Sequence, residues 1–196
     1  MEVIDPPEGG LDPFQETEFN ILFIGNSLTY FNNLPDLVKE VAARDGKDLG
    51  VKMIAQPNYA IVDHWDIGQV QQEIRTGKYD FVVIQQGPSS QQDGRQMLIE
   101  EGAKYASIFH EYNVRLAYFM VWPSITYYHT FDGVIENYTD AAKLNTAILC
   151  PVGKEWKLYI DSSGDYSYYG PDGFHPSRKG SEVAAEIIYG SIMSVN

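Results

Sequence analysis

A serine and a histidine near opposite ends of the sequence have neighbours that suit nucleophilic catalysis. Ser27 follows an apolar run and lies in the stretch "GNSLT", and His175 lies in the late stretch "DGFHPS". A serine hydroxyl is a weak nucleophile unless a base lies within hydrogen-bond reach, and imidazole can be that base. Asp172 precedes His175 by three residues, and a turn through Gly173 would bring its carboxylate onto the imidazole. Ser27, Asp172 and His175 are therefore the candidate catalytic residues.

Each of these short stretches also has a purely structural interpretation. Asn26 or Ser27 could cap the helix that begins just after the first strand, because both residue types are common helix caps. Asp172 and Gly173 could form an Asx turn before a helix-entry proline, Pro176. Either stretch alone fits both interpretations.

The other three histidines are weaker candidates for the base. His110 falls late in a predicted helix and is expected at the surface, and His129 has no carboxylate nearby until Asp132. His64 follows Asp63 directly, but neighbours along a helix point away from each other, so this carboxylate could not orient the ring. We expect His64 to be packed or to cap a helix.

Taken together, the two end blocks resemble a known superfamily. "GNSLT" at Gly25–Thr29 and "DGFH" at Asp172–His175 are similar to the first and last blocks of the SGNH hydrolases, also called GDSL esterases and lipases. The similarity spans about residues 19–193. In that superfamily the early block carries the nucleophilic serine, and the late block carries the acid and the base. The resemblance implies the same roles for Ser27, Asp172 and His175, without a cofactor or a metal ion.

The two middle blocks depart from the superfamily pattern. The second block usually supplies a glycine whose N–H faces the oxyanion, and the matching stretch "QPNYAIVDHW" has Asn58 in that place. Asparagine tolerates left-handed backbone conformations better than most residues, so its N–H could take the same orientation. The third block is normally Gly-x-Asn-Asp, and here Ser89 and Ser90 occupy the Asn-Asp places. Carbohydrate-acetylesterase branches carry a Gln-Gly pair, which assigns the amide donor to Gln86, with Gln85 as the substitute. The resemblance thus implies an oxyanion site made by Ser27, Asn58 and Gln86.

The substrate prediction comes from what surrounds these blocks. The chain has no apolar lid-like insertion, which favours a short acyl group such as acetyl. Two loops are rich in aromatic residues, whose faces suit stacking on sugar rings, so a carbohydrate ester is the leading substrate class. The candidate substrate-contacting residues are Gln85, Trp122, Tyr127 and Phe174. Aromatic side chains also often pack beneath long loops, so a structural role is the alternative.

These residues must be positioned by strands and helices, and the apolar pattern predicts both. Five apolar runs of four to eight residues suit buried parallel strands: 19–24, 51–55, 81–84, 114–121 and 147–150. Segments with helical spacing lie between them, at 34–41, 67–74, 97–109 and 133–144, and a last one follows a Ser177 cap. The alternation predicts a three-layer α/β/α sandwich with a five-stranded parallel sheet of the flavodoxin-like kind. Ligands bind at the carboxyl ends of such strands, where Ser27 falls.

Composition limits the partners. The chain has 196 residues, 44% hydrophobic and 21% charged, and a net charge of −13. Such a charge repels phosphate backbones and anionic lipids, so we expect neither nucleic acid nor membrane insertion, and a small-molecule or carbohydrate ester as the partner. The single cysteine, Cys150, forms no intrachain disulfide and is expected to be a small buried residue. The oligomeric state is not encoded in any pattern.

Residues 1–18 are predicted to be a linker and residues 19–196 one domain. The first segment holds six acidic residues, three prolines and no lysine or arginine. It suits a spacer exposed after a signal peptide is removed from a secreted or periplasmic protein, and equally an acidic tail on a cytoplasmic one.

Three functions fit the sequence. The first is a serine esterase that acts through an acyl-enzyme on Ser27. The second is a catalytically weak or inactive carbohydrate-binding protein with the same fold, favoured by the altered middle blocks. The third is transfer of the acyl group to another alcohol instead of water, since the acyl-enzyme is common to both outcomes. No G-x-S-x-G, phosphate-loop, H-E-x-x-H or dinucleotide motif competes with them.

Overall fold

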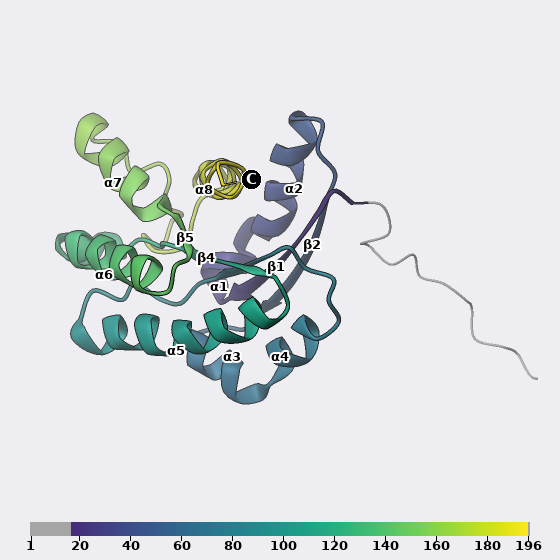
Figure 1. The fold of residues 1–196 in the computed structure, drawn as a ribbon. Coiled ribbons are helices and arrows are strands. Elements are labelled where there is room, and N and C mark those ends of the chain that lie inside the picture. Colours follow the sequence, from purple (N-terminus) through teal and green to yellow (C-terminus); the bar gives the residue numbers. More distant parts are fainter. Residues whose placement is uncertain (1–16, 196) are drawn as a thin grey trace, which may run out of the picture.

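A computed structural model describes residues 17–195 and shows one parallel sheet between layers of helices (Figure 1). The strand order is β2-β1-β3-β4-β5, and every neighbouring pair is parallel. The strands are β1 (Phe19–Gly25), β2 (Leu49–Ala55), β3 (Phe81–Ile84), β4 (Arg115–Phe119) and β5 (Ile148–Cys150). The predicted sandwich with five parallel strands is confirmed, and each strand begins and ends within two residues of its predicted bounds.

Helices cover both faces of the sheet (Figure 1). One face carries α2 (Leu34–Arg44) and α8 (Arg178–Met193), which pack against each other. The other carries α3 (Ile61–Ile67), α4 (Gln69–Ile74) and α5 (Gln92–Glu111). Next to α5 lies α6 (Phe131–Leu144), and α7 (Val152–Ser163) contacts both α6 and α8. The short α1 (Ser27–Tyr30), η1 (Phe31–Asn33) and η2 (Ile125–Thr130) complete the order.

Two helices differ from the sequence-based expectation. The helix predicted over 67–74 corresponds to α4, and Gly68, whose φ is 79°, separates it from α3, which the apolar spacing did not predict. Helix α7, which begins directly after its N-cap Pro151, is absent from the helices that the apolar spacing predicts. Proline is well tolerated where a helix begins, because the first N–H groups have no partner within the helix.

The core lies on both sides of the central strands. Residues 21–24 of β1 and Phe81–Ile84 of β3 are at most 1% exposed, as expected for parallel strands covered by helices on both faces. Beyond β4, Trp122 and Trp156 stack with ring centroids 3.6 Å apart and are fully buried. Cys150 is buried as predicted, and burial raises the pKa of its thiol to about 12.

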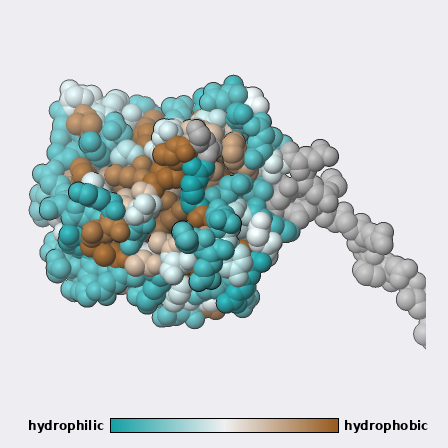
Figure 2. Space-filling model, in the orientation of Figure 1, coloured by the Kyte–Doolittle hydropathy of each residue, from teal (hydrophilic) through white to brown (hydrophobic). Residues whose placement is uncertain are grey.

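The surface fits an acidic protein. Most of the face drawn in Figure 2 is hydrophilic, with hydrophobic residues gathered towards its middle. Among the helices of residues 17–195, none has the length and apolar character needed to cross a membrane. The predicted linker, residues 1–18, lies outside the described residues except for its end, where the Glu18 N–H donates to the Asp48 carbonyl at 2.9 Å.

Candidate active site

Ser27 is the first residue of α1, directly beyond the carboxyl end of β1. The Asn26 side chain caps this helix by accepting a hydrogen bond from the Leu28 N–H at 3.1 Å. The capping role therefore belongs to Asn26. No hydrogen bond within residues 17–195 involves the Ser27 hydroxyl, which lines a pocket of about 210 Å³ with Asn58 and Phe174. This hydroxyl lies at the strand end where α/β sheets bind ligands.

A buried amide pair holds the turn before Ser27. Gln85 Oε1 accepts from the Asn26 N–H at 3.0 Å and from Thr29 Oγ1 at 2.7 Å, and Gln85 Nε2 donates to Asn26 Oδ1 at 3.0 Å. A Cβ at Gly25 would come within 2.3 Å of Thr29 Oγ1 and 2.4 Å of Gln85 Oε1. Glycine is therefore required at position 25 by close approach. Asn26 Nδ2 also donates to the Tyr59 carbonyl at 2.9 Å, which ties the turn to the next loop.

The buried His64 side chain also supports the turn before Ser27. It is 2% exposed, and its Nε2 lies 2.8 Å from the Gly25 carbonyl oxygen. Because a carbonyl only accepts, Nε2 carries the hydrogen. Burial lowers the pKa of His64, which keeps the ring neutral. The expected packed role is confirmed, and Asp63 instead accepts from the Ala60 N–H at the start of α3, at 2.7 Å.

Asp172 and His175, which we call the acid–base pair, are in direct contact. Asp172 Oδ2 lies 2.5 Å from His175 Nδ1, and Asp172 Oδ1 accepts from the N–H groups of Phe174 and His175 at 3.0 and 2.9 Å. Gly173 makes the turn with a φ of 69°. The hydrogen bond from His175, helped by the two backbone N–H groups, holds the pKa of Asp172 below its ordinary value. The Asp172 carboxylate thus forms the Asx turn with Oδ1 and contacts the imidazole with Oδ2.

The nucleophile turn and the acid–base pair meet at three points. The Phe31 ring stacks on the His175 ring with centroids 4.1 Å apart, and the Phe31 N–H donates to the Ser27 carbonyl. Asn32 Nδ2 donates to the Pro176 carbonyl at 3.2 Å, and Phe174 lines the Ser27 pocket. Within residues 17–195 no hydrogen bond joins Ser27 Oγ to the imidazole. Hydrogen bonds of this type are often long without substrate and tighten when it binds.

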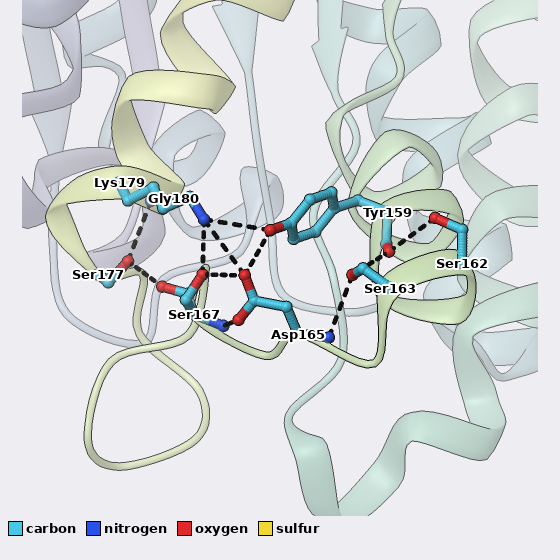
Figure 3. Close-up of polar contacts among 8 residues, drawn as sticks. All are labelled: Tyr159, Ser162, Ser163, Asp165, Ser167, Ser177, Lys179 and Gly180. Atoms are coloured by element: carbon cyan, nitrogen blue, oxygen red, sulfur yellow. Dashed lines mark hydrogen bonds and ion pairs between the residues drawn. The ribbon is translucent and has the colours of Figure 1, made fainter.

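A polar network braces the loop that carries the acid–base pair (Figure 3). The Asp165 carboxylate accepts from the Tyr159 hydroxyl and the Ser167 N–H and lies 3.3 Å from Lys179 Nζ. Ser177 Oγ donates to the Ser167 carbonyl at 2.6 Å and caps α8 by accepting from Gly180 N, as predicted for Ser177. The loop is thereby fixed between α7 and α8, on either side of the acid–base pair.

Asn58, which occupies the place of the glycine in the superfamily's second block, has a left-handed backbone conformation. Its φ is 63°, in the left-handed region, and it lines the Ser27 pocket. Asparagine adopts this conformation more readily than other residues with a Cβ. The two expected backbone donors, at Ser27 and Asn58, therefore border the same small pocket.

Gln86 does not reach that pocket, which corrects its assignment as the third oxyanion donor. Its Nε2 donates to Ser89 Oγ at 2.7 Å and to the Gly94 carbonyl at 3.3 Å, and the side chain is 2% exposed. Alternation along the chain after β3 sends Gln85 beneath Ser27 and Gln86 towards α5. Gln85 cannot replace it, because its Nε2 already donates to Asn26 Oδ1 and to the Gln86 carbonyl. Gly87, not either glutamine, lines the pocket.

The four expected substrate contacts divide into two groups. Gln85 and Trp122 are buried, at 1% and 0% exposure, so neither offers a surface to substrate. Trp122 Nε1 instead donates to the Phe174 carbonyl at 2.9 Å, next to His175. Tyr127 is 61% exposed, and it lines with Phe174 a groove of about 640 Å³. Buried indole rings satisfy their N–H internally, which is why aromatic content alone misassigned Trp122.

Within the part of the chain that the structure describes, no hydrogen bond or ion pair joins the remaining histidines to the acid–base pair. His110 is exposed at the end of α5, as expected, and His129 is exposed in η2. Among residues 17–195, no group of three or more His, Cys, Asp or Glu side chains is arranged to bind a metal ion.

Sequence reasoning missed Thr29 and Phe31, although both lie within four residues of Ser27. Thr29 is 1% exposed and donates to Gln85, and Phe31 stacks on His175. A buried threonine and a half-exposed phenylalanine have no distinctive spacing, so only their positions in space reveal these contacts.

Comparisons with solved structures agree with this fold. No protein-family model and no curated protein matches the sequence. Among solved structures, a protein from Slackia heliotrinireducens assigned as an SGNH hydrolase superposes with a TM-score of 0.76 at 21% identity, over 89% of this chain and 98% of the other. A lipase/acylhydrolase from Enterococcus faecalis gives 0.70 at 19% identity, over 90% and 96%. A variant of an acetyl-xylooligosaccharide esterase from Geobacillus gives 0.64 at 15% identity, over 90% and 94%.

Proposed function

We propose that this chain, which has the fold of the SGNH hydrolases, is a serine esterase that hydrolyses short acyl esters through an acyl-enzyme on Ser27. The observation that carries the proposal is the 2.5 Å contact between Asp172 and His175 on a loop that packs against the Ser27 turn. With Nδ1 facing Asp172, Nε2 is the nitrogen left to accept the serine proton. The orientation of the base is thus fixed before substrate arrives.

The reaction proceeds in two acyl transfers. Ser27 Oγ bonds to the ester carbonyl carbon as its proton moves to His175 Nε2, and the carbonyl electron pair moves onto oxygen. When the tetrahedral species collapses, the bond to the alcohol oxygen breaks and the alcohol takes the proton from Nε2. Water then attacks the acyl-enzyme by the same route, which releases the acid and restores Ser27. Asp172 stabilises the imidazolium in both steps.

The oxyanion is held by two backbone donors, the N–H groups of Ser27 and Asn58. Preorganised donors of this type each contribute about 100- to 1,000-fold to the rate. The Ser27 N–H lies at the start of α1, and the left-handed turn at Asn58 is fixed by the neighbouring Tyr59 carbonyl, which accepts from Asn26. The Gln86 amide takes no part.

Two pockets support a small acyl group and a carbohydrate alcohol. The pocket at Ser27 measures about 210 Å³, which suits acetyl, and Phe174 borders both it and the larger groove. That groove combines apolar surfaces with hydroxyl and amide groups, a mixture that can stack on sugar rings and bond their hydroxyls. It is lined by Pro88, Ser90, Gln91, Pro123, Ser124, Tyr127, Thr130 and Phe174. The similarity to an acetyl-xylooligosaccharide esterase adds to the case for an acetylated sugar.

The test compares the parent protein with Ser27→Ala on p-nitrophenyl acetate, butyrate and octanoate, and on acetylated oligosaccharides with acetate release as the readout. We expect the parent to prefer acetate and Ser27→Ala to lose about 1,000-fold or more of kcat/KM. A fluorophosphonate probe should label the parent on Ser27 and leave the variant unlabelled. Equal rates in both proteins would contradict the proposal.

A second candidate function is a carbohydrate-binding protein with weak or no activity. It is favoured by the Gln86 amide, which bonds Ser89 and Gly94 instead of lining the pocket, and by the absence of a hydrogen bond between Ser27 and His175 within residues 17–195. Calorimetry with acetylated oligosaccharides separates the two functions, because binding without acetate release and without probe labelling supports this one.

A further inference from the structure

The His175 imidazole is held between two aromatic rings. The Phe31 ring lies nearly parallel to it, with centroids 4.1 Å apart and planes 14° apart, and the Phe174 ring meets it edge-on at 5.2 Å and 63°. Asp172 fixes Nδ1 at the ring edge. Phe31 therefore covers one face of the imidazole. Phe31, Phe174 and Asp172 together restrict rotation about the side-chain bonds of His175.

Phe31 is itself anchored to the nucleophile element. Its N–H donates to the Ser27 carbonyl, so its backbone continues the turn that begins with the nucleophile. The next residue, Asn32, donates from Nδ2 to the Pro176 carbonyl at 3.2 Å and to Ser181 Oγ at 2.9 Å. A movement of the serine turn relative to the histidine loop would have to disrupt these bonds. Phe31 is 37% exposed, so its ring covers His175 at the surface and not within the core.

A parallel aromatic face interacts differently with the two states of the base. The negative face of a phenyl ring attracts a cation within about 6 Å of its centroid. Imidazolium forms whenever the serine proton is transferred, so the attraction grows as the transition state is approached. Two charged side chains share the pocket with His175: Asp172, which favours the cation, and Arg178, which opposes it. Arg178 Nε donates a hydrogen bond to Glu182 Oε1 at 2.9 Å, so this carboxylate offsets part of the Arg178 charge.

We propose that Phe31 is a positioning residue for the base, which holds the imidazole plane so that Nε2 faces Ser27 and stabilises the imidazolium through its ring face. This inference rests on the proposed esterase function. It adds a fourth side chain to Ser27, Asp172 and His175, and this side chain comes from the nucleophile's own turn. The effect belongs to the chemical step, so it should act on kcat and leave KM unchanged.

The experiment compares Phe31→Leu, which keeps apolar bulk without a ring face, with Phe31→Tyr, which keeps the ring. We expect Phe31→Leu to lower kcat on p-nitrophenyl acetate by about 3- to 10-fold with KM unchanged, and Phe31→Tyr to stay within about 2-fold of the parent. Proton NMR supplies a readout without turnover: the His175 ring protons, shielded by the Phe31 ring, should move downfield in Phe31→Leu and remain in place in Phe31→Tyr. Thermal unfolding confirms that both variants are folded.

The outcomes separate this inference from the function on which it rests. An active parent whose kcat is unchanged in Phe31→Leu overturns the role of Phe31 and leaves the esterase intact. The same holds if Phe31→Tyr is as impaired as Phe31→Leu, or if the His175 ring protons are identical in all three proteins. If the parent hydrolyses no ester and is not labelled by a fluorophosphonate, the esterase function fails and the role of Phe31 fails with it.

Discussion

The Gln85 side chain makes two hydrogen bonds with Asn26 beneath the candidate nucleophile, one with its backbone N–H and one with its side chain. Gln85 Oε1 accepts from the Asn26 N–H, and Gln85 Nε2 donates to Asn26 Oδ1, both at 3.0 Å. Through Asn26 this pair also reaches the Leu28 N–H and the Tyr59 carbonyl. The hydrogen bonds of Asn26 and Gln85 therefore join three segments that follow β1, β2 and β3 and lie far apart in the sequence.

Replacing Gln85 by methionine should therefore harm both stability and activity. Met fills a similar volume but leaves the Asn26 N–H and the Thr29 hydroxyl without their acceptor, at about 1–3 kcal/mol for each buried polar group. We expect urea denaturation to show a loss of about 2–4 kcal/mol in the free energy of unfolding, together with lower kcat. The matched control is the exposed Gln91→Met, which should change unfolding by less than about 0.5 kcal/mol.

Substitutions of Asn58 distinguish a backbone donor from a side-chain donor. Its φ of 63° suits glycine but costs about 1–2 kcal/mol for a residue such as alanine. If the N–H holds the oxyanion, Asn58→Gly should keep kcat within about 3-fold, and Asn58→Ala should lower it by about 10- to 100-fold. Steady-state kinetics on p-nitrophenyl acetate provide the measurement. A large loss in Asn58→Gly would instead assign the donor to the side-chain amide.

Removal of the Tyr127 ring should affect sugar esters selectively. Tyr127 is 61% exposed in the groove, so Tyr127→Ala removes a stacking surface and little internal packing. We expect KM for an acetylated oligosaccharide to rise about 5- to 30-fold with kcat unchanged, and the kinetics of p-nitrophenyl acetate to stay the same. A rise in KM for both substrates would argue against a sugar-binding groove. Tyr166→Ala, another exposed tyrosine outside the groove lining, is the control.

Asp165 makes part of the stability depend on pH. The hydrogen bond from the Tyr159 hydroxyl, with those from Ser167, holds the pKa of Asp165 below its ordinary value of 3.8. A carboxyl group with a lowered pKa in the folded state stabilises that state above its ordinary pKa and stops doing so as the pH falls through the folded value. The Tm difference between the parent and Asp165→Asn should therefore be largest above about pH 5 and shrink in more acidic buffers. A Tm difference that is constant with pH would contradict this assignment.

Cys150 should be unreactive in the folded protein. Burial raises the pKa of its thiol to about 12, so almost no thiolate is present at neutral pH. Mass spectrometry after iodoacetamide treatment at pH 8 should show no adduct in native buffer and one adduct in denaturing urea. Rapid alkylation of the native protein would show that β5 opens readily.

Local patterns were sufficient for the strands and for the acid–base pair. The apolar runs predicted all five strands, and the signal is clearest for the central strands, because residues buried on both faces of a parallel sheet are almost continuously apolar. The contact between Asp172 and His175 needed only a three-residue separation and a glycine turn, so it too could be inferred locally. Helix α7 could not be inferred locally, because a proline that precedes a helix and a proline that ends one look the same in the sequence.

By itself, then, the sequence determined the strands of the α/β sandwich and the contact between Asp172 and His175, since each depends on residues within a few positions of one another. The resemblance to the superfamily, and no local pattern, pointed to Asn58. Only the tertiary structure decided the contacts of Gln85, Gln86, Trp122 and Phe31. Each of these side chains could contact substrate or pack inside. Whether such a side chain contacts substrate or packs inside depends on which polar atoms from distant segments lie within hydrogen-bond distance. A buried amide or indole N–H is almost always hydrogen-bonded to a partner inside the protein.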